Sequence, residues 1–179
     1  MRELSLHILD LIENSIRAGA SVISVTVVED PGRDLLAITV EDNGSGSSLT
    51  PDQITDPFYT TKEGKRTGLG LSLLRAAAEQ AGGTLTIDRS SLGGMAVTAR
   101  MQLTHFDRKP LGDLATTLSS VVCTNPGLDL WCRLSSPQGE FVVRVSDVVK
   151  EVGVNDRCGL AIARRVSEKI TSGLAVITG

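Results

Sequence analysis

Two polar residues one helical turn apart are the first side chains in the chain that could do chemistry. Asp10 and Asn14 are four residues apart, so they project from the same side of a predicted helix. An amide oxygen such as that of Asn14 is a good ligand for Mg²⁺, which completes its octahedron with phosphates and water. The Asp10 carboxylate could orient or deprotonate a group that attacks a phosphate. The alternative is an ordinary solvated helix face.

A second polar block, Glu41 to Gly46, ends an apolar run that has the pattern of a strand. The carboxylate of Asp42 could accept a hydrogen bond from the amino group of an adenine base. Gly44 and Gly46 would let the backbone pass close to that base and adopt unusual φ angles. A plain Asp-Asn-Gly turn explains the same residues equally well.

Two further blocks could contact phosphate oxygens. Thr61 and Lys62 offer a hydroxyl and an ammonium group within the loop 56–62. Gly68 and Gly70 open directly into a predicted helix, where backbone N–H groups and the helix dipole favour an anion. This glycine pair lacks the spacing of a P-loop. A solvated loop and a tight turn are the ordinary explanations of these two blocks.

Hydrophobic periodicity predicts the elements that must position these blocks. Apolar residues recur at helical spacing in the first segment, and alternating runs separated by turn residues predict two hairpins. The predicted elements are a helix at 2–18, strands at 22–29 and 35–42, a loop-rich stretch at 43–70, a helix at 71–81, and strands at 84–88 and 96–103.

A change of composition near residues 105–110 predicts a boundary between a domain at 1–104 and a smaller α/β segment at 105–179. The segment is predicted to contain a helix at 111–122, strands at 128–134 and 141–145, and helices near residue 148 and at 159–170. This order is similar to that of the first elements. It indicates either a degenerate internal repeat or an ordinary appendage.

Composition excludes several classes of function. The chain has 179 residues, of which 41% are hydrophobic and 3% aromatic, with a net charge of −3. The few aromatic residues and the slight negative charge argue against a nucleic-acid partner. No apolar run approaches the roughly 20 residues that span a bilayer, so no membrane segment is expected. The three cysteines form no C-x-x-C pair, which favours reduced thiols in the cytoplasm.

Taken together and in this order, the four blocks resemble the boxes of the GHKL ATPases, the group of gyrase, heat-shock chaperones, histidine kinases and mismatch-repair ATPases. The resemblance covers about residues 3–103. The matching positions are Asn14 for the N box, Asp42, Gly44 and Gly46 for the first glycine box, Phe58 to Lys62 for the F box, and Gly68, Gly70 and Leu71 for the second glycine box.

The resemblance implies a Bergerat-type α+β sandwich, a mixed sheet with helices on one face, that binds ATP with Mg²⁺. By this resemblance Asn14 holds Mg²⁺ and Asp42 recognises adenine. The other implied contacts are Gly44 and Gly46 along the base, Phe58, Thr61 and Lys62 in the F-box loop, the Gly68-Leu69-Gly70-Leu71 turn at the phosphates, and Arg17 near the phosphates.

Four departures from the family pattern affect the expected activity, and one of them is a short lid at residues 63–67, whose closure over ATP could need a partner. Asp10 stands where gyrase-type and serine-kinase members carry a catalytic Glu, and its side chain is one methylene shorter. Only thirteen residues precede Asn14, which leaves no room for the phosphoacceptor hairpin of a histidine kinase, and His7 lies inside the helix itself. Met95 stands near a Thr that several relatives place beside adenine. We therefore expect either a phosphotransferase or ATPase acting in trans, on a Ser or His of another protein, or a non-catalytic, nucleotide-responsive binding module.

The partner is not readable from the sequence. The segment from Asp107 to Asp113 faintly resembles an extension on stand-alone ATP-binding proteins encoded near hydrogenase and NADH-dehydrogenase-like genes. This resemblance implies a redox-enzyme complex as partner. The hairpin of the C-terminal segment could instead form a homodimer or cover the sheet.

Overall fold

The computed structural model describes residues 3–45, 69–153 and 159–177. In chain order the elements are α1 (Leu4–Arg17), β1 (Val22–Asp30), the short 3-10 helix η1 (Pro31–Arg33), β2 (Leu35–Asp42), α3 (Leu69–Gln80), β3 (Thr84–Arg89), β4 (Met95–Gln102), α4 (Leu114–Thr124), β5 (Asp129–Ser136), β6 (Gly139–Arg144), α5 (Val145–Val152) and α6 (Gly159–Ile177).

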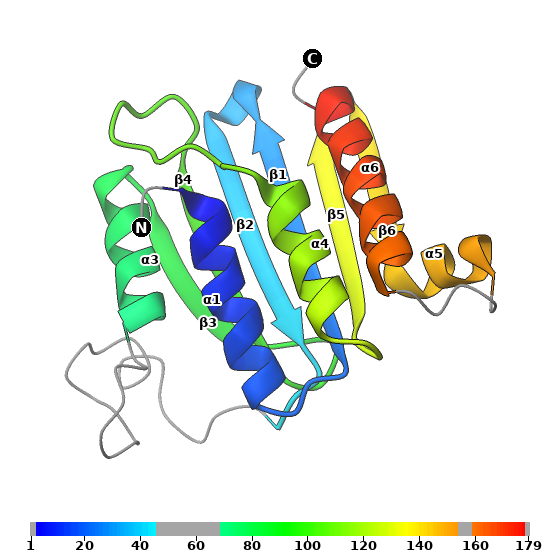
Figure 1. The fold of residues 1–179 in the computed structure, drawn as a ribbon. Coiled ribbons are helices and arrows are strands. Elements are labelled where there is room, and N and C mark those ends of the chain that lie inside the picture. Colours follow the sequence, from blue (N-terminus) through cyan, green and yellow to red (C-terminus); the bar gives the residue numbers. More distant parts are fainter. Residues whose placement is uncertain (1–2, 46–68, 154–158, 178–179) are drawn as a thin grey trace.

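The strands form one mixed sheet of six strands in the order β3-β4-β2-β1-β5-β6 (Figure 1). Neighbouring strands run antiparallel except for β1 and β5, which run parallel. The strands beyond residue 105 therefore continue the sheet that the first four strands begin. The division of the chain at that residue stays a prediction of the sequence.

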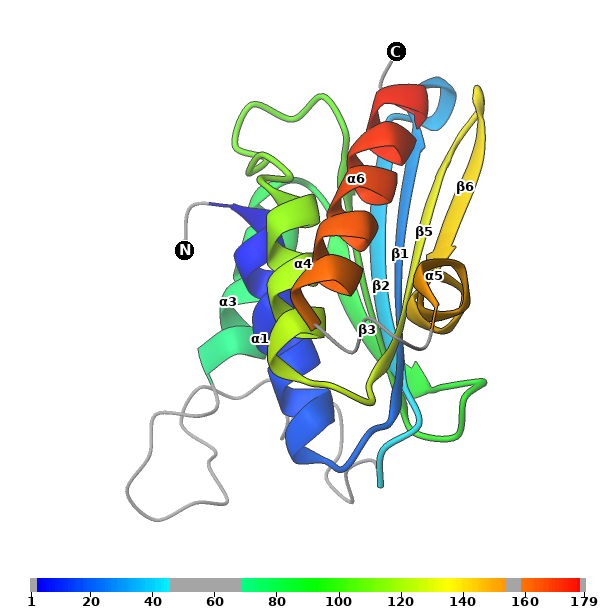
Figure 2. The same ribbon diagram turned by 45° about the vertical axis from the view of Figure 1, so that its right-hand side comes forward.

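Alternation along the strands gives the sheet one apolar face. In β1 the buried residues are Ile23, Val25 and Val27, and the residues between them are partly exposed. Because successive side chains of a strand point to opposite faces, the buried set must face a covering layer. Figures 1 and 2 show α1, α3, α4 and α6 together on one side of the sheet. The predicted α+β sandwich with helices on one face is confirmed.

The first helix is fixed by its buried face and by its first turn. Its buried positions, among them Leu4, Ile8 and Ile12, recur at helical spacing and pack into the core. The backbone N–H groups of Leu4 and Ser5 donate to the carbonyls of Pro110 and Leu111, so the connector before α4 satisfies the first turn. The helix therefore presents a defined face to its neighbours.

Two boundaries in the C-terminal segment differ from the sequence prediction. The first helix there begins at Leu114, because the carboxylate of Asp113 accepts a hydrogen bond from the Thr116 backbone N–H and caps the helix. The last helix runs to Ile177. Within this helix Gly173 lets the ring of Phe141 approach the backbone, where a Cβ would overlap the ring. None of the described helices has both the length and the apolar character needed to cross a bilayer.

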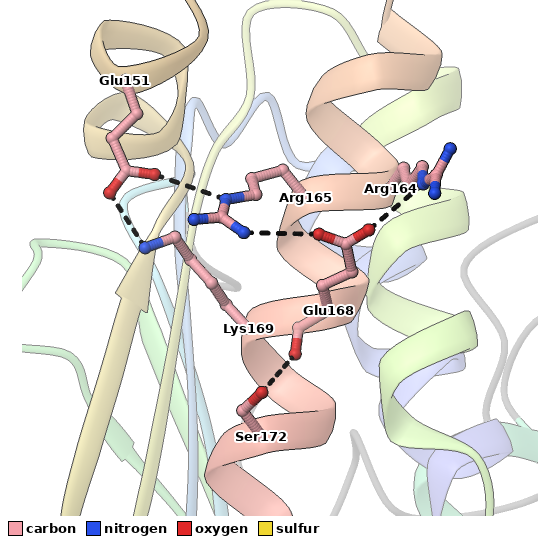
Figure 3. Close-up of polar contacts among 6 residues, drawn as sticks. All are labelled: Glu151, Arg164, Arg165, Glu168, Lys169 and Ser172. Atoms are coloured by element: carbon pink, nitrogen blue, oxygen red, sulfur yellow. Dashed lines mark hydrogen bonds and ion pairs between the residues drawn. The ribbon is translucent and has the colours of Figure 1, made fainter.

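Ion pairs join α5 to α6 (Figure 3). The carboxylate of Glu151 in α5 receives the ammonium of Lys169 at 2.9 Å and the guanidinium of Arg165 at 3.6 Å, both from α6. Glu168 then pairs with Arg164 and Arg165 along α6. These hydrogen-bonded ion pairs lower the pKa of both carboxyl groups. Because all of these groups are at the surface, salt must screen the network.

Candidate functional site

The carboxylate of Asp42 is buried at the end of β2 and is held by three donors. Its Oδ2 accepts a hydrogen bond from the Ser15 hydroxyl at 2.6 Å. Its Oδ1 accepts from the backbone N–H groups of Gly44 at 2.9 Å and Met95 at 3.2 Å. A carboxylate offers about four lone-pair positions, so the donors among the described residues leave one position for a further donor.

Gly94 lies so close to this carboxylate that no side chain fits. A Cβ on Gly94 would lie 2.1 Å from Oδ1 of Asp42 and 2.7 Å from its carbonyl oxygen. The Gly94 backbone N–H donates to that same carbonyl at 3.0 Å. The turn between β3 and β4 is therefore fitted directly against the end of β2.

Asn14 in α1 directly precedes Ser15, so the predicted metal ligand adjoins the donor that holds Asp42. The Asn14 side chain is partly exposed, and its Oδ1 accepts a hydrogen bond of 2.5 Å from the guanidinium of Arg17. The amide oxygen thus already faces a positively charged group. The helix brings Asn14 and Arg17 together as their spacing predicts.

Asp10 lies one turn earlier on α1, against the first turn of α3. A Cβ on Gly70 would lie 3.0 Å from Oδ2 of Asp10 and 3.1 Å from its Cβ, which is tighter than an ordinary contact. Burial, followed by repulsion from Glu13, raises the pKa of the Asp10 carboxyl above its usual value. The structure therefore places this carboxylate beside the start of α3, where the sequence predicts a phosphate site.

The donor set fits Mg²⁺ better than a metal that needs a complete protein cage. In the described part of the chain, no group of three or more His, Cys, Asp and Glu residues could enclose a metal ion. The Asn14 oxygen is a hard ligand that already accepts a cationic group. Mg²⁺ commonly takes one or two protein oxygens and completes its shell with phosphates and water.

The remaining predicted site residues form two groups, those in the described part of the chain and those outside it. α3 begins at Leu69, so Gly70 and Leu71 lie in its first turn, and the Leu71 side chain is buried in the core. Gly44 follows Asp42 and packs against Ala18. Gly46, Phe58, Thr61, Lys62, Gly68 and the Leu69 side chain lie outside the described residues.

Two residues of the site were missed by the sequence reasoning. In the sequence, nothing distinguishes Ser15 from the other polar residues of the first helix. In the structure it is only 5% exposed, and its hydroxyl donates a hydrogen bond to Asp42. Gly94 reads as half of a Gly-Gly turn. A small polar residue at a buried helical position would have indicated Ser15, whereas the proximity of Gly94 to Asp42 depends on how β4 pairs with β2.

The fold and site define an α+β sandwich domain whose candidate site lies between α1, the start of α3 and the end of β2. Residues 2–105 match the family described as histidine kinase-, DNA gyrase B- and HSP90-like ATPases. The chain belongs to this family.

Several sensor kinases are similar to part of the chain. It is 35% identical over 92 residues to the sensor histidine kinase CpxA of Escherichia coli K12, covering 48% of this chain and 20% of CpxA. It is 38% identical over 84 residues to the sensor histidine kinase ZraS of Salmonella typhi, covering 45% of this chain and 17% of ZraS. The chain therefore spans about a fifth of the length of these relatives.

Two solved structures are also similar. The ATP-binding domain of PrrB from Mycobacterium tuberculosis is 24% identical, with 55% of this chain and 67% of that chain covered and a TM-score of 0.40. The MutL ATPase domain of Aquifex aeolicus, solved with ADP, is 16% identical, with 80% and 63% covered and a TM-score of 0.45.

Proposed function

We propose that this chain binds ATP with Mg²⁺ and transfers the γ-phosphoryl group to a Ser or His of another protein. The observation that carries the proposal is the Asp42 carboxylate, buried and held by three donors, one of which is Ser15, the residue that follows Asn14 on α1. A preorganised acceptor next to a hard oxygen ligand suits a base and a metal-bound phosphate chain. Membership of the ATPase family supports it.

In this proposal Asp42 recognises adenine. The exocyclic amino group donates to the acceptor position that Ser15, Gly44 and Met95 leave available. Gly44 and Gly46 let the backbone approach the base. Guanine presents a carbonyl oxygen at the corresponding position, so it would face the carboxylate with an acceptor.

The phosphate chain is proposed to lie toward α3. Its first-turn N–H groups and dipole favour negative charge there. Arg17, Thr61, Lys62 and the turn from Gly68 to Leu71 supply the remaining phosphate contacts. Asn14 would hold Mg²⁺, which when bound neutralises charge on the phosphate oxygens.

Asp10 is proposed to orient or deprotonate the attacking group. It lies against Gly70 at the start of α3, on the phosphate side of the site. Burial, followed by repulsion from Glu13, raises its pKa, which makes it a stronger base than an exposed aspartate. Because the Asp10 side chain is one methylene shorter than Glu, a water molecule would link its carboxylate to the attacking group.

The phosphoacceptor is proposed to come from elsewhere, because His7 is unsuited to the role. Its side chain is 1% exposed, and its Nε2 faces the ammonium of Lys109 at 3.5 Å. A buried ring in the first turn of α1, about two turns from Asn14, cannot reach a γ-phosphate. Phosphate transfer from labelled ATP to a candidate protein would test this step directly.

One titration tests the proposal as a whole. ATP affinity is measured with and without Mg²⁺ for the unmodified chain and for Asn14→Ala, Asp42→Asn and Asp10→Asn, with Asp107→Asn as an exposed control. Asn14→Ala should lose the Mg²⁺-dependent part of the affinity. Asp42→Asn should weaken binding by roughly one to two orders of magnitude and lose selectivity against GTP. No affinity for ATP at millimolar concentration would contradict the proposal.

A second candidate function is a nucleotide-responsive binding module, with a redox-enzyme complex as one candidate partner. Asp10 favours it, because a side chain one methylene shorter than Glu is held against Gly70 and is less able to reach a substrate. A nucleotide changes partner affinity only if it binds more tightly to one of the two conformations, the one that binds the partner or the one that does not. Equal partner affinity with ATP, with ADP and without nucleotide would eliminate this candidate.

A further inference from the structure

The outer side of β6 is open. Among the described strands, β6 is the last of the sheet and has a neighbour, β5, on one side only. Figure 2 shows α5 below the end of β6 rather than beside it. The side chain of Val142, in the middle of the strand, is 44% exposed. An edge strand with an exposed apolar residue at its centre can accept another strand.

The hairpin that joins β5 to β6 determines which backbone groups face outward. Ser136 pairs with Gly139 across a two-residue loop, and such a turn is closed by a backbone hydrogen bond between its flanking residues. Hydrogen-bonded pairs and non-hydrogen-bonded pairs alternate along antiparallel strands. The backbone N–H groups that face away from β5 are therefore those of Glu140, Val142 and Arg144.

The side chains at these three positions form a pattern that is complementary to itself. Glu140 is acidic, Val142 is apolar and Arg144 is basic. All three point to the same face of the sheet, because they are two residues apart along the strand. In the opposite direction the order is base, apolar residue, acid. An antiparallel copy of the strand centred on Val142 therefore places a base opposite each acid.

We infer that β6 pairs antiparallel with β6 of a second copy of the chain, about a two-fold axis that passes beside Val142 and is perpendicular to the sheet. The two Val142 residues then exchange backbone hydrogen bonds, and their side chains are in contact. Glu140 lies opposite Arg144 of the second copy, at the Cβ separation of roughly 4.5–5.5 Å that is typical of cross-strand pairs. The two six-stranded sheets become one continuous sheet.

Both charged residues have partners within the chain and can each take a further one. The Glu140 carboxylate receives the guanidinium of Arg133 at 3.1 Å, and its other oxygen can accept a second donor. The guanidinium of Arg144 lies 4.3 Å from the centre of the Trp131 ring. Contact with the face of a ring uses none of its N–H donors, so they remain available to Glu140 of the second copy.

Other registers of β6 and the other edge strand lack this complementarity. A shift by two residues places Val142 opposite Glu140 or opposite Arg144, so neither charge meets its opposite. At the other edge of the sheet, β3 carries Asp88 and Arg89 as consecutive residues, which point to opposite faces. Residues directly opposite each other in paired strands share a face, so this acid and this base cannot meet about such an axis.

The helix that covers β6 has a small residue at the level of the axis. A Cβ on Gly139 would lie 3.9 Å from Val176, and a Cβ on Gly173 would overlap the ring of Phe141. α6 therefore runs opposite to β6, and Ser172 lies near the level of the centre of the strand. This serine is exposed. Helix axes pack about 8–10 Å apart, depending on the side chains at the contact, so a serine here favours close packing of α6 against α6 of the second copy.

Reversing the charges at the two ends of the strand provides the decisive test. Glu140→Arg and Arg144→Glu should each weaken the dimer about ten-fold in analytical ultracentrifugation, because like charges then meet twice in each homodimer. An equimolar mixture of the two variants should dimerise like the unmodified chain, and so should the double variant, because each acid again meets a base. Asp88→Arg and Arg89→Glu, on the other edge strand, are matched controls that should leave the dimer unchanged.

Hydrogen exchange locates the interface independently of these variants. The amide of Val142 should become protected as the concentration of the chain rises, with the same midpoint as in ultracentrifugation, whereas the amides of β3 should not change. Val142→Pro removes an N–H group that faces away from β5, so it should abolish the dimer and leave the sheet within each chain intact. Val142→Thr, which keeps the N–H group and the branched side chain, should still dimerise.

Four results would overturn the inference. The first is a chain that stays monomeric at about 1 mM, since one strand and one helix from each copy should give at least millimolar affinity. The second is a dimer in which β6 gains no protection from hydrogen exchange. The third is a dimer that both charge reversals leave unchanged. The fourth is a failure of both the mixture and the double variant to recover the dimer.

Discussion

The hydroxyl of Ser15 donates a 2.6 Å hydrogen bond to Oδ2 of Asp42, and this bond links the last turn of α1 to the end of β2. Both residues are buried, at 5% and 3% exposure, so water cannot replace the donor. Asn14 and Ser15 are consecutive residues. The bond therefore fixes the candidate metal ligand relative to the candidate base-recognition residue.

Ser15→Ala should weaken ATP binding about ten-fold while leaving the fold intact. The substitution removes one of three donors to a buried carboxylate, and hydrogen bonds to charged groups are worth about 1.5–3 kcal/mol. Asp42 would keep its two backbone donors, so the loss is expected to be partial. Isothermal titration calorimetry with ATP measures it.

Ser119→Ala is the matched control for this substitution. Ser119 is also on a helix, and its hydroxyl donates to a backbone carbonyl instead of a carboxylate. ATP affinity should stay unchanged in Ser119→Ala. Unchanged affinity in Ser15→Ala would mean that the hydroxyl has no part in preparing Asp42.

Gly94→Ala should abolish ATP binding and destabilise the chain by about 1–3 kcal/mol, the usual cost of overpacking. Its new Cβ would lie 2.1 Å from Oδ1 of Asp42, so the carboxylate would have to move. Chemical denaturation and ATP titration measure the two effects. Gly139→Ala is the control, because a Cβ there meets no atom closer than 3.9 Å. Full ATP affinity in Gly94→Ala would contradict the assigned role of Asp42.

The sequence predicted the local features of the fold well, because they depend on local chemistry. Alternation predicted β1 and β2, and the turn residues between them form η1, where the Asp30 side chain accepts from the Arg33 N–H. Helical spacing predicted α1 and placed Asp10 and Asn14 one turn apart. These features depend on residues that are neighbours along the chain.

Long-range features could not be predicted in the same way. The parallel pairing of β1 with β5 joins residues more than a hundred positions apart, and no local pattern specifies it. The contact of Gly94 with Asp42 depends on the register between β4 and β2. Ser15 became identifiable as part of the site only when both its burial and its partner were known.

Neutralising Glu151 should loosen α5 from α6 in a salt-dependent way. Glu151→Gln removes the carboxylate that receives both Lys169 and Arg165 (Figure 3). At low salt, backbone amides of α5 should exchange hydrogen faster than in the unmodified chain. At 1 M NaCl the difference should largely disappear, because the Debye length is then about 3 Å. Asp147→Gln is the control, and a difference that persists at high salt would show that these ion pairs are not its cause.

Burial of His7 should make the chain less stable as the pH falls from 6.5 to 4. Burial, followed by the nearby charge of Lys109, lowers the pKa of His7 from 6.5 to about 4. Between these values the unfolded chain binds a proton that the folded chain does not. The free energy of unfolding should therefore fall with decreasing pH by up to about 1.4 kcal/mol per unit, and the fall should end near pH 4.

His7→Gln should remove this part of the pH dependence, whereas His105→Gln should keep it, since these are the two histidines of the chain. Urea denaturation at half-unit steps from pH 7 to pH 4 measures all three proteins. Carboxyl groups titrate in every variant, so the difference between the curves isolates the contribution of His7. Among the described residues the buried Nδ1 of His7 has no hydrogen-bond partner, so Gln removes no hydrogen bond made by that atom. Equal slopes for His7→Gln and the unmodified chain would mean that the ring is already protonated or solvated in the folded protein.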